Sequence, residues 1–175
     1  MQSVKVVVSG PFNAGKTTFI KAVSEISVLS TERQVSDVSG EGGGETTVAM
    51  DFGRITVSDD VVLYLFGTPG QERFSFMWET LSEGMLGFVL LVDGTSPQSV
   101  GDASSMIEFF RGMSDVPFVV AANRVQASDA EALGLIRGDL GLDDSIPLIA
   151  VDARDKESVK DVLLGLLNEI LQSMN

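Results

Sequence analysis

Cysteine and histidine are both absent from the 175 residues of this chain. The lack of cysteine excludes a disulfide framework, and the lack of both residues excludes zinc sites of the ordinary type and any Ser-His or Cys-His catalytic pair. Chemistry must therefore come from carboxylates or from the electrostatic binding of groups such as phosphate.

Positive charge is scarce, with 12 Lys and Arg residues against 25 Asp and Glu residues and a formal net charge of −13. Nucleic acids and anionic membrane surfaces also carry fixed negative charge, so we expect no broad face that binds either of them. Solubility is the ordinary consequence of such acidity.

Long apolar runs are missing as well. No run approaches the ~18 residues of a membrane-spanning helix, no charged-then-apolar leader precedes the first apolar run, and the last residues, 172–175, hold no cysteine for prenylation. We therefore expect a soluble, cytoplasmic protein without a direct lipid anchor. Residues 1–175 suffice for a single domain that needs no structural metal.

The most informative segment present is a phosphate loop. An apolar run, Val4 to Val8, leads into Gly10-Pro11-Phe12-Asn13-Ala14-Gly15-Lys16-Thr17, a complete G-x-x-x-x-G-K-[ST] pattern. Its backbone N–H groups are expected to cradle phosphate at the start of a helix, with the lysine on the terminal phosphates and the threonine hydroxyl on Mg²⁺. The predicted phosphate-binding residues are Asn13, Ala14, Gly15, Lys16, Thr17 and Thr18.

Apolar runs of strand length alternate with helical patterns along the chain. Buried strands are predicted at 4–8, 61–66, 87–92, 118–122 and 147–151, an edge strand at 48–57, and helices at 15–27, 97–113, 129–140 and 156–172. The short turn at 58–60 predicts an antiparallel hairpin. This order indicates a three-layer α/β domain of the P-loop NTPase kind, with a mostly parallel sheet of about six strands and one antiparallel edge strand.

The stretch from Ser27 to Glu45 is polar and ends in a glycine-rich run. Because it offers little apolar surface to bury, we predict a mobile segment, either a nucleotide-gated switch or a plain flexible linker.

Further motifs follow the predicted strands in a fixed order. They are Thr47 before the edge strand, Gly67-Thr68-Pro69-Gly70-Gln71, Asn123-Arg124-Val125-Gln126 and Asp152-Ala153-Arg154. With the phosphate loop, this order resembles the Ras-like small GTPases over essentially the whole chain, in a prokaryotic branch, and Val92 to Pro97 resembles the Rab type. The resemblance implies binding of GTP and GDP with Mg²⁺.

The resemblance also assigns catalytic roles. Thr47 would be the switch threonine that closes onto Mg²⁺ and the γ-phosphate, Gly70 would place its N–H near that phosphate, and Gln71 would orient the attacking water, with Lys16 on the terminal phosphates. A strand-initiating threonine and a plain Pro-Gly turn are the alternatives. The switch loops would span residues 28–47 and 68–78.

Base recognition departs from the family pattern Asn-Lys-x-Asp. Arg124 replaces the lysine and can still stack on the base, while Asn123 can tie the loop together or act as a turn residue. Gln126 has one carbonyl oxygen where the aspartate has two acceptors, so guanine specificity is expected to be weakened. Ala153, through its backbone N–H, and Arg154 complete the nucleotide-binding residues that the resemblance implies.

The predicted metal site also departs from the family pattern, because Gly67 stands where the family usually has an aspartate. We hypothesise that Asp51, on the adjacent strand, replaces that carboxylate and joins Thr17 and Thr47 around the metal; an exposed edge-strand acid is the alternative. Phe12 puts a bulky ring near the γ-phosphate, and hydrolysis by the chain alone is expected to be slow, at about 10⁻⁴ to 10⁻² s⁻¹.

The aromatic residues from Phe74 to Trp78 are either an anchor patch for a protein partner or ordinary helix core. The leading interpretation is a switch GTPase of low intrinsic rate with an effector or activating partner at its switch loops. A catalytically inactive nucleotide-binding scaffold is the alternative, and a kinase on the same loop is a third. The sequence leaves the oligomeric state open.

Overall fold

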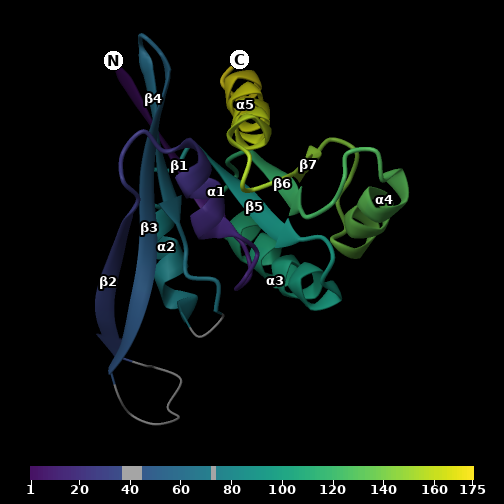
Figure 1. Cartoon of the computed structure of the whole chain (residues 1–175), viewed down its shortest axis with the longest axis horizontal. Coiled ribbons are helices and arrows are strands. Elements are labelled where there is room, and N and C mark those ends of the chain that lie inside the picture. The colour runs from purple at the N-terminus through teal and green to yellow at the C-terminus, as the bar shows by residue number, and fades with distance from the viewer. Residues whose placement is uncertain (37–44, 72–73) are drawn as a thin grey trace.

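The computed structural model describes residues 1–36, 45–71 and 74–175, and side chains within residues 1–28, 50–71 and 74–175. These parts of the chain form a seven-stranded sheet in the order β2-β3-β4-β1-β5-β6-β7 (Figure 1). The strands are β1 (Gln2–Ser9), β2 (Leu29–Ser36), β3 (Glu45–Ser58), β4 (Val61–Gly67), β5 (Gly87–Asp93), β6 (Phe118–Asn123) and β7 (Leu148–Val151). The helices are α1 (Lys16–Val23), α2 (Phe76–Ser82), α3 (Pro97–Met113), α4 (Ala130–Asp139) and α5 (Lys156–Ser173).

The strand directions confirm the predicted fold class. Strands β4, β1, β5, β6 and β7 run parallel to one another, whereas β3 is antiparallel to β4 and β2 is antiparallel to β3. The predicted hairpin at 58–60 therefore joins β3 to β4. The carboxyl ends of the parallel strands meet at one edge of the sheet, which is where ligands bind in α/β folds.

Alternating side chains of the buried strands supply two cores, one on each face. Val6 and Val8 pack with α1 and α5, whereas Val7 packs with α2, α3 and α4. A strand whose neighbouring side chains point to opposite faces can be apolar throughout only if both faces are covered. Helices cover both faces of the sheet, as the apolar runs predicted (Figure 1).

Strand β2 corrects the expectation of a mobile segment between Ser27 and Glu45. Residues 29–36 pair antiparallel with residues 45–52 of β3, while residues 37–44 of the same prediction lie outside the described part of the chain. Pairing of β3 with β4 begins at Asp51, so β2 and the first half of β3 form a two-stranded ribbon (Figure 1). A two-stranded ribbon needs no continuous apolar face, and polar composition therefore did not exclude it.

Helix α2 resolves most of the ambiguity over the aromatic residues. Trp78 is 4% exposed, and its indole N–H donates to the carbonyl of Pro69 over 2.8 Å. Phe74 is buried as well, whereas Phe76 is 43% exposed. Phe74 and Trp78 are therefore core, and Phe76 alone of these three is available at the surface.

No helix in the described ranges combines the length and apolar character that crossing a membrane requires.

Candidate nucleotide-binding site

The phosphate loop joins the end of β1 to the start of α1. Gly15 precedes the helix with a φ of 106°, a left-handed conformation that favours glycine, and a Cβ there would lie 2.6 Å from Nδ2 of Asn123. Because Gly15 has no side chain to cap the helix, the first N–H groups of α1 remain open to an anion. The motif therefore has the local geometry that phosphate binding requires.

Lys16 folds back onto its own loop. Its Nζ donates hydrogen bonds to the carbonyl oxygens of Gly10 and Pro11 over 2.6 and 2.8 Å, and the N–H of Ala14 donates to Pro11 over 3.2 Å. Burial lowers the pKa of Lys16 to about 8, partly offset by the negative charge of Asp51. A bound polyphosphate would supply the charge that this buried ammonium lacks.

Gly70 lies against the phosphate loop. A Cβ at Gly70 would come within 2.5 Å of the backbone nitrogen of Phe12 and 2.6 Å of Nζ of Lys16. The chain segment after β4 therefore touches the loop at the point predicted for the γ-phosphate.

Gln71 follows Gly70 and lines a cavity of about 400 Å³ between the phosphate loop, α2 and α3. Phe12, a residue that is 62% exposed, lines the same cavity. The predicted water-orienting residue and the bulky ring that we expect near the γ-phosphate thus share one space.

Asp51 and Thr17 are brought together across the sheet edge. The Thr17 hydroxyl donates to Oδ2 of Asp51 over 2.5 Å. Asp51 lies opposite Gly67 in the β3–β4 register, and a Cβ at Gly67 would lie 3.2 Å from Cβ and 3.5 Å from Oδ2 of Asp51. The Asp51 carboxylate therefore occupies the space that a side chain at Gly67 would need.

Thr47 lies within β3 rather than before it, because β3 begins at Glu45 and pairs Thr47 with Gln34 of β2. Four residues of extended chain, about 13 Å, separate it from Asp51. In this structure the ribbon thus holds Thr47 away from the phosphate loop, and its predicted metal contact requires the ribbon to rearrange.

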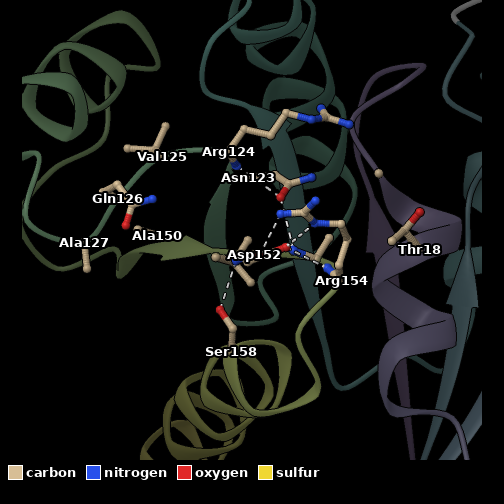
Figure 2. A pocket seen from close by; sticks show the side chains of 13 residues that line it. Thr18, Asn123, Arg124, Val125, Gln126, Ala127, Ala150, Asp152, Arg154 and Ser158 are labelled. Carbon is tan, nitrogen blue, oxygen red and sulfur yellow. Dashed lines mark hydrogen bonds and ion pairs between the residues drawn. The ribbon is translucent and has the colours of Figure 1, made fainter.

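A second cavity, of about 810 Å³, lies beyond the phosphate loop between the loops that follow β6 and β7 (Figure 2). Asn123, 5% exposed, connects its walls. Its Nδ2 donates to the carbonyl of Ala14 over 3.0 Å, and its Oδ1 accepts from the N–H groups of Arg124 and Ala153, each over 3.1 Å. This side chain ties the phosphate loop to both base-side loops.

Two arginines border this cavity. Nη1 of Arg124 lies 2.9 Å from Oδ2 of Asp93 and donates to the carbonyl of Asn13 over 3.3 Å, so its guanidinium bridges to the phosphate loop. Arg154 pairs through Nε with Oδ1 of Asp152 over 3.0 Å. Thr18 of α1 and Gln126 also line the cavity, which places all the predicted base-side residues around one space.

Sequence reasoning missed the two carboxylates that hold these arginines. Asp93 and Asp152 both stand at the carboxyl ends of strands, inside motifs that the resemblance had quoted, and that position was the available signal. Hydrogen bonds from Arg154 lower the pKa of Asp152. Burial by itself would raise the pKa of Asp93, but the hydrogen bonds from Thr95 and the charge of Arg124 outweigh it, so that this pKa is lowered as well.

The parallel sheet, the phosphate loop and the two cavities at its carboxyl edge define a P-loop nucleotide-binding protein with a small-GTPase-like architecture. A family model described as "Conserved hypothetical ATP binding protein" matches residues 28–137, more than half of the sequence. The chain therefore belongs to this family.

Curated proteins are also similar to this chain. An uncharacterized protein of Methanocaldococcus jannaschii is 30% identical over 73% of this chain and 74% of its own. Human Ras-related protein Rab-8B is 25% identical over 74% of this chain, and the match spans 66% of the Rab-8B sequence. Mouse Ras-related protein Rab-3C is 25% identical over 98% of this chain and 73% of its own. The chain is thus related both to a nucleotide-binding family and, distantly, to Ras-related proteins.

Proposed function

We propose that this protein is a molecular switch that binds GTP and GDP with Mg²⁺ and hydrolyses GTP slowly. The observation that carries the proposal is the contact of Gly70 with the phosphate loop beside Lys16. In a switch, the segment after β4 must report whether the terminal phosphate is present. Because this segment already contacts the loop, it could report the phosphate through a small change in the positions of the Lys16 ammonium and the Gly70 N–H.

Lys16 gives this change a physical basis. Its ammonium, held by two carbonyl groups of its own loop, would exchange them for phosphate oxygens when a triphosphate binds. The carbonyl oxygens of Gly10 and Pro11 would then be released, and the loop would open around the phosphates. The backbone N–H of Gly70 would gain an anionic acceptor and draw the 68–78 segment inward.

The oxygen donors of Thr17 and Asp51 fit a magnesium ion. Hydroxyl and carboxylate oxygens are the ligands that Mg²⁺ takes in nucleotide sites, together with phosphate oxygens and water. Thr17 would ligate the ion directly, and Asp51, already bonded to Thr17, would orient Thr17 or a metal-bound water. When bound there, the ion would neutralise part of the charge on the phosphates.

Hydrolysis would depend on Gln71, which lies beside Gly70 and would orient the attacking water. Phe12 lines the same cavity, so its ring would lie in the path of an arginine supplied by a partner. The chain alone is therefore expected to turn over at about 10⁻⁴ to 10⁻² s⁻¹, and an activating partner would act by positioning Gln71.

The partner surfaces would be the segments 28–47 and 68–78, which include β2, the first residues of β3 and the first turn of α2. Phe76, exposed next to the buried Phe74 and Trp78, is the aromatic residue there that an effector could contact.

A matched pair of variants tests the proposal. Gln71→Leu should bind fluorescent GTP as the parent chain does but release phosphate at least tenfold more slowly in single turnover. The control is Gln172→Leu, which makes the same substitution in the exposed last turn of α5 and should leave the phosphate release rate unchanged. Equal phosphate release by all three chains would contradict the proposed role of Gln71.

The alternative, a catalytically inactive nucleotide-binding scaffold, is favoured by Gly67, Phe12 and Gln126, which depart from the family pattern. It predicts nucleotide binding with no phosphate release above that of the buffer. Phosphate release by the parent chain that Gln71→Leu reduces would exclude it.

A further inference from the structure

The donors and acceptors that line the base-side cavity determine which base it selects. A guanine presents two neighbouring donors, N1–H and the exocyclic amino group, beside the acceptor O6, whereas an adenine presents the donor N6–H₂ beside the acceptor N1. Selection of guanine therefore depends on two acceptors fixed next to each other, such as the oxygens of one carboxylate.

Most polar groups around this cavity are already engaged. Oδ1 of Asn123 accepts two backbone N–H groups, including that of Ala153, which was the expected donor to the guanine oxygen. Both carboxylate oxygens of Asp152 accept from Arg154, over 3.0 and 3.2 Å. The carboxylate in the lining is thus held by a guanidinium, and the buried amide of Ala153 is held by Asn123.

The Gln126 side chain differs from these groups. Gln126 lines the cavity, and its side-chain amide makes no hydrogen bond to any other described residue. Figure 2 shows it at one end of the cavity, separate from the cluster of Asn123, Asp152 and Arg154, with Thr18 of α1 at the opposite end. A nucleotide with its phosphates near Thr18 would direct its base toward Gln126.

A glutamine amide presents one acceptor, Oε1, beside one donor, Nε2. In one orientation it can accept from N6–H₂ of adenine and donate to N1. Turned by half a rotation about its terminal bond, it can accept from N1–H of guanine and donate to O6. Either base therefore makes two hydrogen bonds with the same side chain, at the cost of one low-barrier rotation.

We infer that this cavity admits adenine as readily as guanine, so that ATP and GTP bind with dissociation constants within about tenfold of each other. The inference rests on the proposed nucleotide site and adds a second ligand to it. Stacking by Arg124 does not change the result, because every purine offers the same face to a guanidinium plane.

Competition against a fluorescent GTP analogue on the full chain with Mg²⁺ tests this inference. ATP and GTP should displace the analogue at concentrations within tenfold of each other. In Gln126→Asp, which restores two adjacent acceptors, the preference for GTP should rise at least thirtyfold. The control Gln172→Asp adds the same charge on exposed α5 and should leave the ratio unchanged.

Two results would overturn the inference alone. One is a preference of the parent chain for GTP above tenfold, and the other is an unchanged ratio in Gln126→Asp. If the parent chain does prefer GTP, Asp152→Asn identifies the group responsible, since loss of that preference would show that Asp152 leaves Arg154 to read the base. Failure of both triphosphates to displace the analogue, or of the analogue to bind, would instead overturn the proposed function.

Discussion

Removal of the Asp51 carboxylate should weaken the magnesium dependence of nucleotide binding. Asp51 accepts a 2.5 Å hydrogen bond from the hydroxyl of Thr17, the predicted metal ligand. In Asp51→Ala this hydroxyl loses the partner that orients it, while the apolar contacts of the phosphate loop are kept. Loss of a group that orients a metal ligand typically costs ten- to a hundredfold in metal affinity. The free Mg²⁺ concentration that half-saturates the slowing of nucleotide release should rise by that factor.

The register also predicts a rescue. Gly67→Asp alone should destabilise the chain, because its Cβ would lie 3.2 Å from the Cβ of Asp51 and two carboxylates would share one space. The double change Asp51→Gly with Gly67→Asp moves the acid to the opposite position of the neighbouring strand and removes the conflict with Asp51, while the new Cβ still meets the flexible end of Ile20, 3.1 Å from its Cδ1. It should restore at least part of the magnesium dependence that Asp51→Ala loses.

The assay follows release of a fluorescent nucleotide in buffers of controlled free Mg²⁺. Asp59→Ala, which removes an exposed acid from the turn of the same hairpin, is the control and should behave as the parent chain does. An Asp51→Ala chain with an unchanged half-saturating concentration would refute the assignment of Asp51 to the metal site.

Three further results are expected. Because the pKa of Lys16 in the folded chain is about 8, nucleotide binding above that pH should be accompanied by uptake of a proton. Nucleotide affinity, measured by calorimetry, should therefore fall about tenfold between pH 7 and pH 9. An affinity that stays constant over this range would contradict the burial of the Lys16 ammonium. Asn123→Ala should lower the unfolding free energy by at least about 2 kcal/mol and speed amide exchange at Ala153, because it leaves buried groups unpaired; unchanged exchange would contradict this. In denaturant unfolding, Trp78→Ala should lower the free energy of unfolding by about 3–5 kcal/mol and Phe76→Ala by less than about 1 kcal/mol. Equal losses in the two variants would contradict the assignment of Trp78 to the core.

The fold could be predicted where the pattern of burial is strong. Helix α3 begins at Pro97 and ends at Met113 as expected, because a serine N-cap, a proline in the first turn and regularly spaced apolar residues mark it. Strand β2 carried no such signal, since six of its eight residues are polar and its two apolar residues, Leu29 and Val35, do not alternate with them.

The site could be predicted only in part, because a sequence motif does not show which distant residues its side chains contact. The missing acid at Gly67 and strand alternation pointed to Asp51 as a candidate, but its hydrogen bond from Thr17 depends on how β3 lies against α1. The bond of Ala153 to Asn123 likewise joins residues 30 positions apart. Such long-range pairs follow from packing of the whole sheet, which local patterns do not encode.

Protection of the folded chain against heat by a magnesium nucleoside triphosphate tests the central claim most directly. At a concentration a hundredfold above the dissociation constant, binding to the folded state should add about 2.7 kcal/mol and raise the melting temperature by about 5 to 10 °C. The free nucleoside, which lacks phosphates, and the Lys16→Ala chain should both show little or no rise. An unchanged melting temperature of the parent chain at millimolar triphosphate would contradict the account of the phosphate loop.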